Sequence, residues 1–190
     1  DEMEEMMEEM KTEEWMKKLE EFQMSNEDLE KELDRNLEML KKFEFEQALE
    51  ESIEKLKEII DQQEDLKESN DEKSQPQESI TEQQKELNKV FEKFSDKLDG
   101  LQQKNEELEK RANLSDTDSL QTTIEQQMQE SKENSEKNKR KKTSQSQQKT
   151  LDKMEALKEK LEQAQKKSGE SGPPEDMEAL RQILENLIDL

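Results

Sequence analysis

The sequence predicts an all-α protein: an elongated antiparallel three-helix coiled-coil bundle with an extra N-terminal amphipathic helix and a short C-terminal helix. Three observations carry this prediction. Large apolar residues recur in alternating steps of four and three over residues 80–112, which is the a/d seam of a coiled coil. Only 26% of the 190 residues are hydrophobic, which is enough for narrow seams but not for a thick core. The breaks at residues 70–76 and 113–117 are short, so successive helices are expected to lie side by side.

The chain is strongly acidic, with 53 Asp and Glu against 31 Lys and Arg and a net charge of -22. Disordered chains have a similar composition, but disorder does not require a regular seam, so we favour the bundle. The acidic balance argues against nucleic acid and against an anionic membrane surface as partners, because both are negative. No apolar run approaches the roughly 20 residues of a membrane span, so we expect no direct membrane insertion in this segment.

The residue supply argues against an enzyme. The chain contains no His, no Cys and no Tyr, and its three glycines cannot form a glycine-rich phosphate loop. Acidic pairs such as Glu4/Glu5 and Glu50/Glu51 can bind calcium weakly, but no loop holds their oxygens in place, so we favour a solvated acidic face. We therefore expect no catalytic, cofactor-binding or metal-ligating residues, and no cofactor.

Residues 1–24 predict a Met-rich amphipathic helix. Four methionines recur at helical spacing among glutamates: Met3, Met6, Met7 and Met10. A methionine face is typical of an adaptable surface for variable partners, so these four residues are candidates for partner docking. The alternative, which we favour, is that they pack on other helices of this chain or on residues that precede Asp1.

A bundle is expected over residues 25–165, and its first helix over residues 26–72. Ser25 and Asp28 have the spacing of a capping box, which predicts a helix start at Ser25. The step from Leu40 to Phe45 breaks the alternation of four and three and predicts a stutter. The apolar stripe consists of Leu29, Leu33, Leu37, Leu40, Phe45, Leu49, Ile53, Leu56, Ile59, Ile60 and Leu66.

The second helix is expected over residues 76–112, because Pro76 suits the first turn of a helix. Gln84 and Asn105 stand at seam positions and are interpreted as polar layers that set the register of the helices. Gly100 is interpreted as a gap that admits a bulky neighbour, Phe43 or Phe45. The other seam positions are Ile80, Leu87, Phe91, Phe94, Leu98, Leu101, Leu108 and Ala112.

The third helix is expected over residues 118–165, although residues 129–150 contain no apolar side chain. Two interpretations stay open for that stretch: a polar helical seam, or a helix that frays into a solvated loop. The polar seam would comprise Ser131, Ser135, Asn138 and Gln145. A basic cluster follows, for which we favour pairing with acidic faces over an anion-binding patch or localisation signal: Lys137, Lys139, Arg140, Lys141 and Lys142.

Residues 166–173 predict a Gly/Pro linker, and residues 174–190 predict a short apolar helix that begins near Pro174. So apolar a helix must dock on the bundle, on residues beyond Leu190 or on a partner. Its candidate docking residues are Leu180, Ile183, Leu184 and Leu187. Because the chain starts at Asp1 and ends within an apolar pattern, we expect it to be a fragment of a longer protein.

Two stretches carry a resemblance to a known family. Residues 33–47 have the sequence Leu-Asp-Arg-Asn-Leu-Glu-Met-Leu-Lys-Lys-Phe-Glu-Phe-Glu-Gln. Together with residues 180–187, they resemble segments of a family of large, membrane-anchored envelope proteins of Bacteroidota-type bacteria. The segment in that family is a domain of unknown function. The resemblance implies a helical segment on the periplasmic side of the envelope, with the anchor elsewhere in the parent chain. It implies no activity. A cytoplasmic location is the alternative.

These observations predict a non-catalytic structural or protein-interaction module, a rigid spacer or docking rod within a larger protein. Its expected partner is another protein or another part of the parent chain, and self-association through the seam is open. The alternative function is a holdase-like chaperone that binds unfolded clients through Met-rich and apolar helix faces.

Overall fold

The computed structural model describes the backbone of residues 2–169 and the side chains of residues 16–17 and 26–168. This part of the chain forms four helices and contains no strand: α1 (Glu2–Asp71), α2 (Gln77–Glu106), α3 (Thr117–Glu136) and α4 (Arg140–Gly169). The all-α class is therefore confirmed. The chain divides into two units, residues 1–40 and residues 41–190.

Helix α1 runs through Ser25 without interruption, so the helix start predicted there is wrong. The sequence contains no Gly before Gly100 and no Pro before Pro76, and a serine inside a helix costs only a few tenths of a kcal/mol. The capping pattern at Ser25 therefore lies inside a continuous helix, where no helix begins. The helix ends at Asp71, one residue before the predicted end at 72, and Lys73 just beyond it adopts a left-handed conformation (φ 56°).

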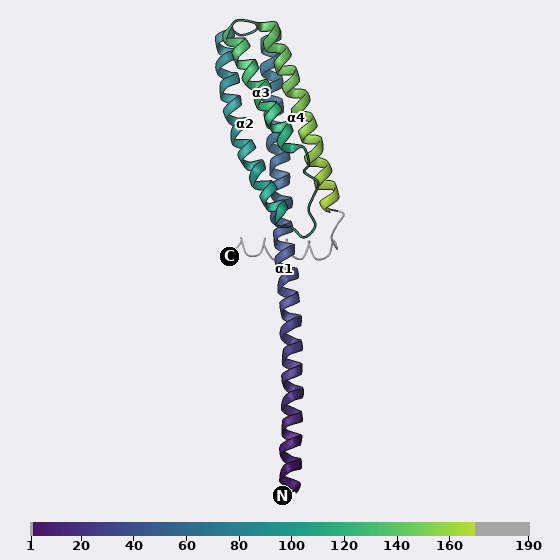
Figure 1. Ribbon diagram of the computed structural model, residues 1–190. Coiled ribbons are helices and arrows are strands. Elements are labelled where there is room, and N and C mark those ends of the chain that lie inside the picture. The colour runs from purple at the N-terminus through teal and green to yellow at the C-terminus, as the bar shows by residue number, and fades with distance from the viewer. Residues whose placement is uncertain (1, 170–190) are drawn as a thin grey trace, which may run out of the picture. The chain divides into compact units, whose positions relative to one another are not determined.

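The second unit is a bundle of residues 41–71 of α1 with α2, α3 and α4 (Figure 1). On α1 and α2, Gln63 hydrogen bonds to Gln84 while Lys104 forms an ion pair with Glu44 at 2.8 Å. Residue numbers rise along one helix as they fall along the other, so the two helices run in opposite directions.

The other neighbouring helices are paired in the same way. Between α2 and α3, the side chain of Gln77 donates to Ser135 Oγ at 2.7 Å, and at the other end Gln102 donates to Thr117 Oγ1 at 2.8 Å. Between α4 and α1, Ser168 Oγ donates to the Glu46 carboxylate at 2.8 Å. The helices therefore alternate in direction around the bundle.

The expected third helix over 118–165 is two helices, α3 and α4, which turn back on each other at residues 137–139. The turn depends on Asn138, whose φ of 54° is tolerated better by Asn than by most residues. At this turn, Lys139 N donates a hydrogen bond to Asn134 O at 2.8 Å, which caps the C-terminal end of α3. The structure thus has four helices in the described chain where the sequence predicted three long ones.

Helix α2 ends at Glu106, six residues before the predicted end at Ala112. Asn105 causes the early end, because its side chain binds the loop rather than another helix. The Asn105 Nδ2 donates to Ala112 O at 2.9 Å, and Ala112 N donates to Asn105 Oδ1 at 2.7 Å. The interpretation of Asn105 as an interhelical polar layer is therefore wrong. Leu108 nevertheless stays buried in the loop.

The core changes in character along the bundle. Away from the α1–α2 and α3–α4 turns it is mainly apolar, with fewer buried polar side chains, and Phe91 and Phe94 lie with ring centroids 5.7 Å apart. Towards those turns, Leu66 and Ile80 share the interior with polar side chains. The buried polar residues of that half include Gln63, Asn70, Gln77, Gln84, Ser131, Ser135, Thr143, Ser146, Gln147 and Thr150.

Gly100 admits no bulky neighbour, because nothing lies within 4 Å of the position its Cβ would occupy. Phe45 is instead fully buried in the apolar core, so the expected contact with Gly100 is wrong. Helix α4 extends to Gly169, which places residues 166–169 of the predicted linker in the helix. The rest of the linker and the expected helix over 174–190 lie outside the described residues.

Candidate functional site

Four exposed leucines follow one face of α1 within residues 26–40. The exposed fractions are 56% for Leu29, 61% for Leu33, 51% for Leu37 and 37% for Leu40. Their spacing of four, four and three residues keeps all four on one side of an α-helix. We call these four residues the leucine stripe. Because adjacent large apolar side chains are seldom left in water, the leucine stripe is a candidate interaction surface.

The sequence had placed the leucine stripe in a buried seam, and that expectation is wrong. The signal that separates it from the core is the predicted stutter between Leu40 and Phe45, since the boundary between the two units falls between Leu40 and Lys41. Phe45 and Leu49, beyond that boundary, are fully buried.

The docking residues predicted from sequence cannot be compared with the leucine stripe. Met3, Met6, Met7 and Met10 belong to the helical backbone of α1, but their side chains lie outside those described. The other four candidates also fall outside the described residues: Leu180, Ile183, Leu184 and Leu187.

A second candidate is a buried polar layer to which each of the four helices contributes one side chain. Gln84 on α2 lies at its centre and donates to Gln63 Oε1 on α1 at 2.9 Å. Gln84 Oε1 accepts from Ser131 Oγ on α3 at 2.9 Å and from Gln147 Nε2 on α4 at 3.2 Å. All four side chains are fully buried. We call these residues the glutamine layer.

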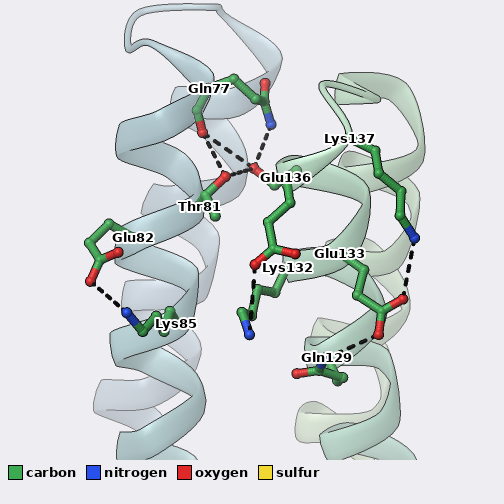
Figure 2. Close-up of polar contacts among 10 residues, drawn as sticks. Gln77, Thr81, Glu82, Lys85, Gln129, Lys132, Glu133, Glu136 and Lys137 are labelled. Carbon is green, nitrogen blue, oxygen red and sulfur yellow. Dashed lines mark hydrogen bonds and ion pairs between the residues drawn. The ribbon is translucent and has the colours of Figure 1, made fainter.

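A second polar cluster lies nearer the turns. Ser135 accepts the hydrogen bond from Gln77, and its hydroxyl also lies 2.7 Å from Thr81 Oγ1. Figure 2 shows Gln77 and Thr81 on α2 directed towards the end of α3, with ion pairs such as Lys132–Glu136 on the surrounding surface. Ser131 and Ser135 of the expected polar seam are thus buried, whereas Asn138 and Gln145 are exposed.

Amides and hydroxyls supply the chemistry of these two clusters. None of the side chains named in them titrates near neutral pH, so they can donate and accept hydrogen bonds but hold no charge. Two acceptors in them, Gln77 Oε1 and Gln147 Oε1, have no hydrogen-bond partner. The clusters are therefore suited to fixing how the helices pair, as expected for Gln84.

The basic cluster at the α3–α4 turn is bound to the bundle at two points. Arg140 Nη2 donates to Gln75 O at 2.7 Å and Arg140 Nη1 to Asn70 O at 3.2 Å, so its guanidinium binds one carbonyl in the last turn of α1 and one in the loop that follows. Lys137 pairs with Glu133 of its own helix at 3.6 Å. The expected pairing with acidic faces of neighbouring helices is replaced, for these two residues, by backbone and intrahelical contacts.

Hollows open on the surface of the bundle in the part of the chain that the structure describes. One of about 580 Å³ lies between α1 and α2, with Leu66 and Leu87 among acidic and amide side chains. One of about 690 Å³ adjoins Arg140 at the turns. A smaller one of about 250 Å³ surrounds Gly100. These three hollows are lined by residues of the second unit.

Asp71, at the end of α1, has a perturbed carboxyl group. Burial raises its pKa, but hydrogen bonds from Lys67 and Ser144 and the charge of Lys67 together lower the pKa below its usual value near 3.8. On α4, the hydrogen bond from Lys158 to Glu155 raises the pKa of that lysine above its usual value. Both shifts are those of surface ion pairs.

Among the described residues, no three acidic side chains converge in a way that can hold a metal ion. None of the described helices has the length and apolar character required to cross a membrane. No family model, no curated protein and no solved structure matches the chain.

Proposed function

We propose that this chain is a non-catalytic structural and protein-interaction module, a spacer or docking rod within a larger envelope protein. The observation that carries the proposal is the leucine stripe, whose four side chains are between 37% and 61% exposed. Patches of this kind in otherwise soluble helices are typical of protein-interaction sites. The proposed partner is another protein or another part of the parent chain.

Coiled-coil packing of the bundle is part of this proposal. Its support is that the predicted seam positions of α2 are all buried, including Ile80, Leu87, Phe91, Phe94, Leu98 and Leu101. Helices that interlock over such a seam keep a fixed length, which is what a spacer requires.

The proposed location is the periplasmic side of the envelope, with a membrane anchor elsewhere in the parent chain, and the alternative is the cytoplasm. The support is the resemblance of residues 33–47 and 180–187 to envelope proteins. Protease treatment of intact and of outer-membrane-permeabilised cells tests it. A periplasmic chain is cleaved only after permeabilisation of the outer membrane, whereas a cytoplasmic chain survives both treatments.

Site-specific photocrosslinking tests the interaction function. A benzophenone amino acid at position 33, in the leucine stripe, is expected to give a discrete crosslinked species in cells. The matched control is position 31, which lies on the opposite side of the same helix turn. Absence of a discrete product at positions 29, 33 and 37 would count against an interaction module.

The alternative function, a holdase-like chaperone, is favoured by the same exposed leucines, because clients of such proteins present apolar segments. An aggregation assay with a model client separates the two functions. A holdase protects the client at an equimolar ratio, and the Leu33→Gln/Leu37→Gln double variant protects less. A docking module gives no protection while still forming its crosslink.

A further inference from the structure

The charges beside the leucine stripe are not symmetric around the helix. Residues 26–40 contain six acidic side chains and two basic ones. At 3.6 residues per turn, Glu30 and Asp34 border one side of the leucine stripe, and Asn36 and Glu32 border the other. Asp28 lies farther round the helix, where it forms an ion pair with Lys31 at 3.6 Å. Lys31 and Arg35 lie on the opposite side of the helix. Both borders of the leucine stripe are therefore acidic.

Acidic borders restrict what can cover the leucine stripe. A helix that packs on an apolar stripe brings its own border residues against Glu30, Asp34 and Glu32, as e and g positions meet in a coiled coil. Like charges there oppose association, whereas lysine or arginine favours it and speeds the encounter. The partner that fits has an apolar face flanked by basic residues.

We propose that the leucine stripe is the docking site for a basic amphipathic helix of another protein. Leucine-like side chains of that helix cover Leu29, Leu33, Leu37 and Leu40, and its Lys or Arg residues pair with the acidic borders. The leucine stripe extends about 17 Å, so it engages about three turns of the partner helix. This inference rests on the proposed interaction function and names the chemistry of the partner.

Two other candidates for covering the leucine stripe are acidic, like its borders. A second copy of the chain would bring the same acidic borders against each other. Residues 174–190 of the chain itself contain five acidic residues and a single basic one, Arg181. Charge complementarity therefore favours a partner outside this chain.

Two matched synthetic helical peptides test the proposal against the full chain. Both carry leucine at the spacing of the leucine stripe; one has lysine at the border positions and the other glutamate. By fluorescence anisotropy at low salt, the lysine peptide is expected to bind about tenfold or more tightly than the glutamate peptide. The difference is expected to shrink at about 1 M NaCl, because salt screens the border charges.

Variants of the chain locate the binding. Leu33→Gln/Leu37→Gln is expected to weaken the lysine peptide by about tenfold or more, whereas Met16→Gln, an exposed apolar residue off the leucine stripe, leaves it unchanged. Glu30→Lys/Asp34→Lys is expected to shift the preference towards the glutamate peptide. Circular dichroism confirms that each variant keeps its helix content.

Several outcomes overturn the inference. Equal affinity for both peptides, or no binding of the lysine peptide at millimolar concentration, removes the role of charge. Self-association that Leu33→Gln/Leu37→Gln abolishes assigns the leucine stripe to a second copy. If phosphatidylcholine vesicles displace the lysine peptide, the leucine stripe is assigned to a lipid surface. If the Leu184→Gln variant binds the lysine peptide more tightly than the parent chain, the leucine stripe is assigned to the chain's own C-terminal segment. A crosslink at position 33 to an acidic helix keeps the proposed function and overturns this inference alone.

Discussion

At the scale of single residues, Gln84 shows how a polar side chain can hold a helical core together. Its amide contacts side chains from the three other helices, so its removal leaves three buried polar groups without their partner. An orphaned buried donor or acceptor costs about 1–3 kcal/mol, more than the net gain from making one hydrogen bond. The glutamine layer therefore stabilises the correct pairing mainly by penalising incorrect ones.

Gln84→Ala is expected to lower the free energy of unfolding by about 2–4 kcal/mol, for the reason just given. Urea unfolding followed by circular dichroism measures this change, with Gln103→Ala on the exposed face of α2 as the control. Replacing the whole glutamine layer by apolar residues (Gln63→Leu, Gln84→Leu, Ser131→Ala, Gln147→Leu) is expected to leave stability equal or higher. If the glutamine layer contributed net stability, the fourfold variant would instead be less stable than both the parent chain and Gln84→Ala.

Asp71 gives a pH dependence whose sign follows from its lowered pKa. Because the pKa is lower in the folded chain, the carboxylate stabilises the fold above its usual pKa near 3.8 and loses this effect as the pH falls through the folded value. Asp71→Asn is expected to reduce stability at pH 7 by at most about 1 kcal/mol, since the Lys67–Asp71 pair is partly exposed.

The difference between Asp71→Asn and the parent chain is expected to shrink as the pH falls through the lowered pKa that Asp71 has in the folded chain, because both forms are neutral below it. Urea unfolding at a series of pH values measures it. Asp61→Asn, on the exposed face of the same helix, controls for the loss of one negative charge. A difference that persists at low pH would assign the effect to packing rather than to ionisation.

At the scale of helices, two of the chain reversals are built in the same way. Lys73 and Asn138 both have positive φ, and in each case the next residue donates a backbone hydrogen bond to the carbonyl five residues earlier. This is the Schellman arrangement, in which glycine is the usual residue at the left-handed position. Lys73 therefore carries a conformational cost that Asn138 carries to a smaller degree.

Lys73→Gly is expected to raise the free energy of unfolding by about 1 kcal/mol, and Asn138→Gly by less, because asparagine already tolerates this conformation. Thermal unfolding of the two variants measures the order. Lys85→Gly, inside α2, is the matched control and is expected to lower stability by about 1 kcal/mol. Equal effects of the two turn variants would contradict the role assigned to asparagine.

The helices could be predicted where apolar spacing or proline decides them, as in the seam of α2 and the break at Pro76. The reversal at Asn138 could not, because neither Gly nor Pro marks it and helix-favouring residues surround it. The glutamine layer was visible in part, as Gln84 at a seam position and Ser131 in the expected polar seam, but the sequence did not show that these two residues meet Gln63 and Gln147 from the other helices. The leucine stripe has the pattern of a buried seam, and a pattern alone does not reveal whether anything lies opposite it.

At the scale of the whole molecule, charge is the dominant imbalance. The net charge is -22, while most of the ion pairs in the described residues join residues three or four apart on one helix. Such pairs contribute only a few tenths of a kcal/mol each and do not offset the repulsion among α1, α2 and α3, whereas α4 has nine basic residues and four acidic ones. The packed interior must therefore hold together a chain that repels itself.

Raising NaCl from about 0.01 M to about 1 M is expected to increase the melting temperature by several degrees, because the screening length falls from about 30 Å to about 3 Å. Circular dichroism melts at matched protein concentration measure it. Sodium chloride is preferred to sulfate, which also strengthens apolar burial. A melting temperature that falls with NaCl would mean that the ion pairs outweigh the repulsion.

The change of core character along the bundle has a mechanical consequence. Water can replace hydrogen bonds among amides and hydroxyls, but it offers no substitute for the contacts of Phe91 and Phe94. Thermal fluctuation is therefore expected to open the bundle first beside its two tight turns, while the phenylalanine end, where α4 ends beside the start of the α1 bundle segment, stays closed. The end of the bundle that connects to the rest of the chain thus keeps its packing while the far end opens and closes, so local opening leaves the length of the spacer unchanged.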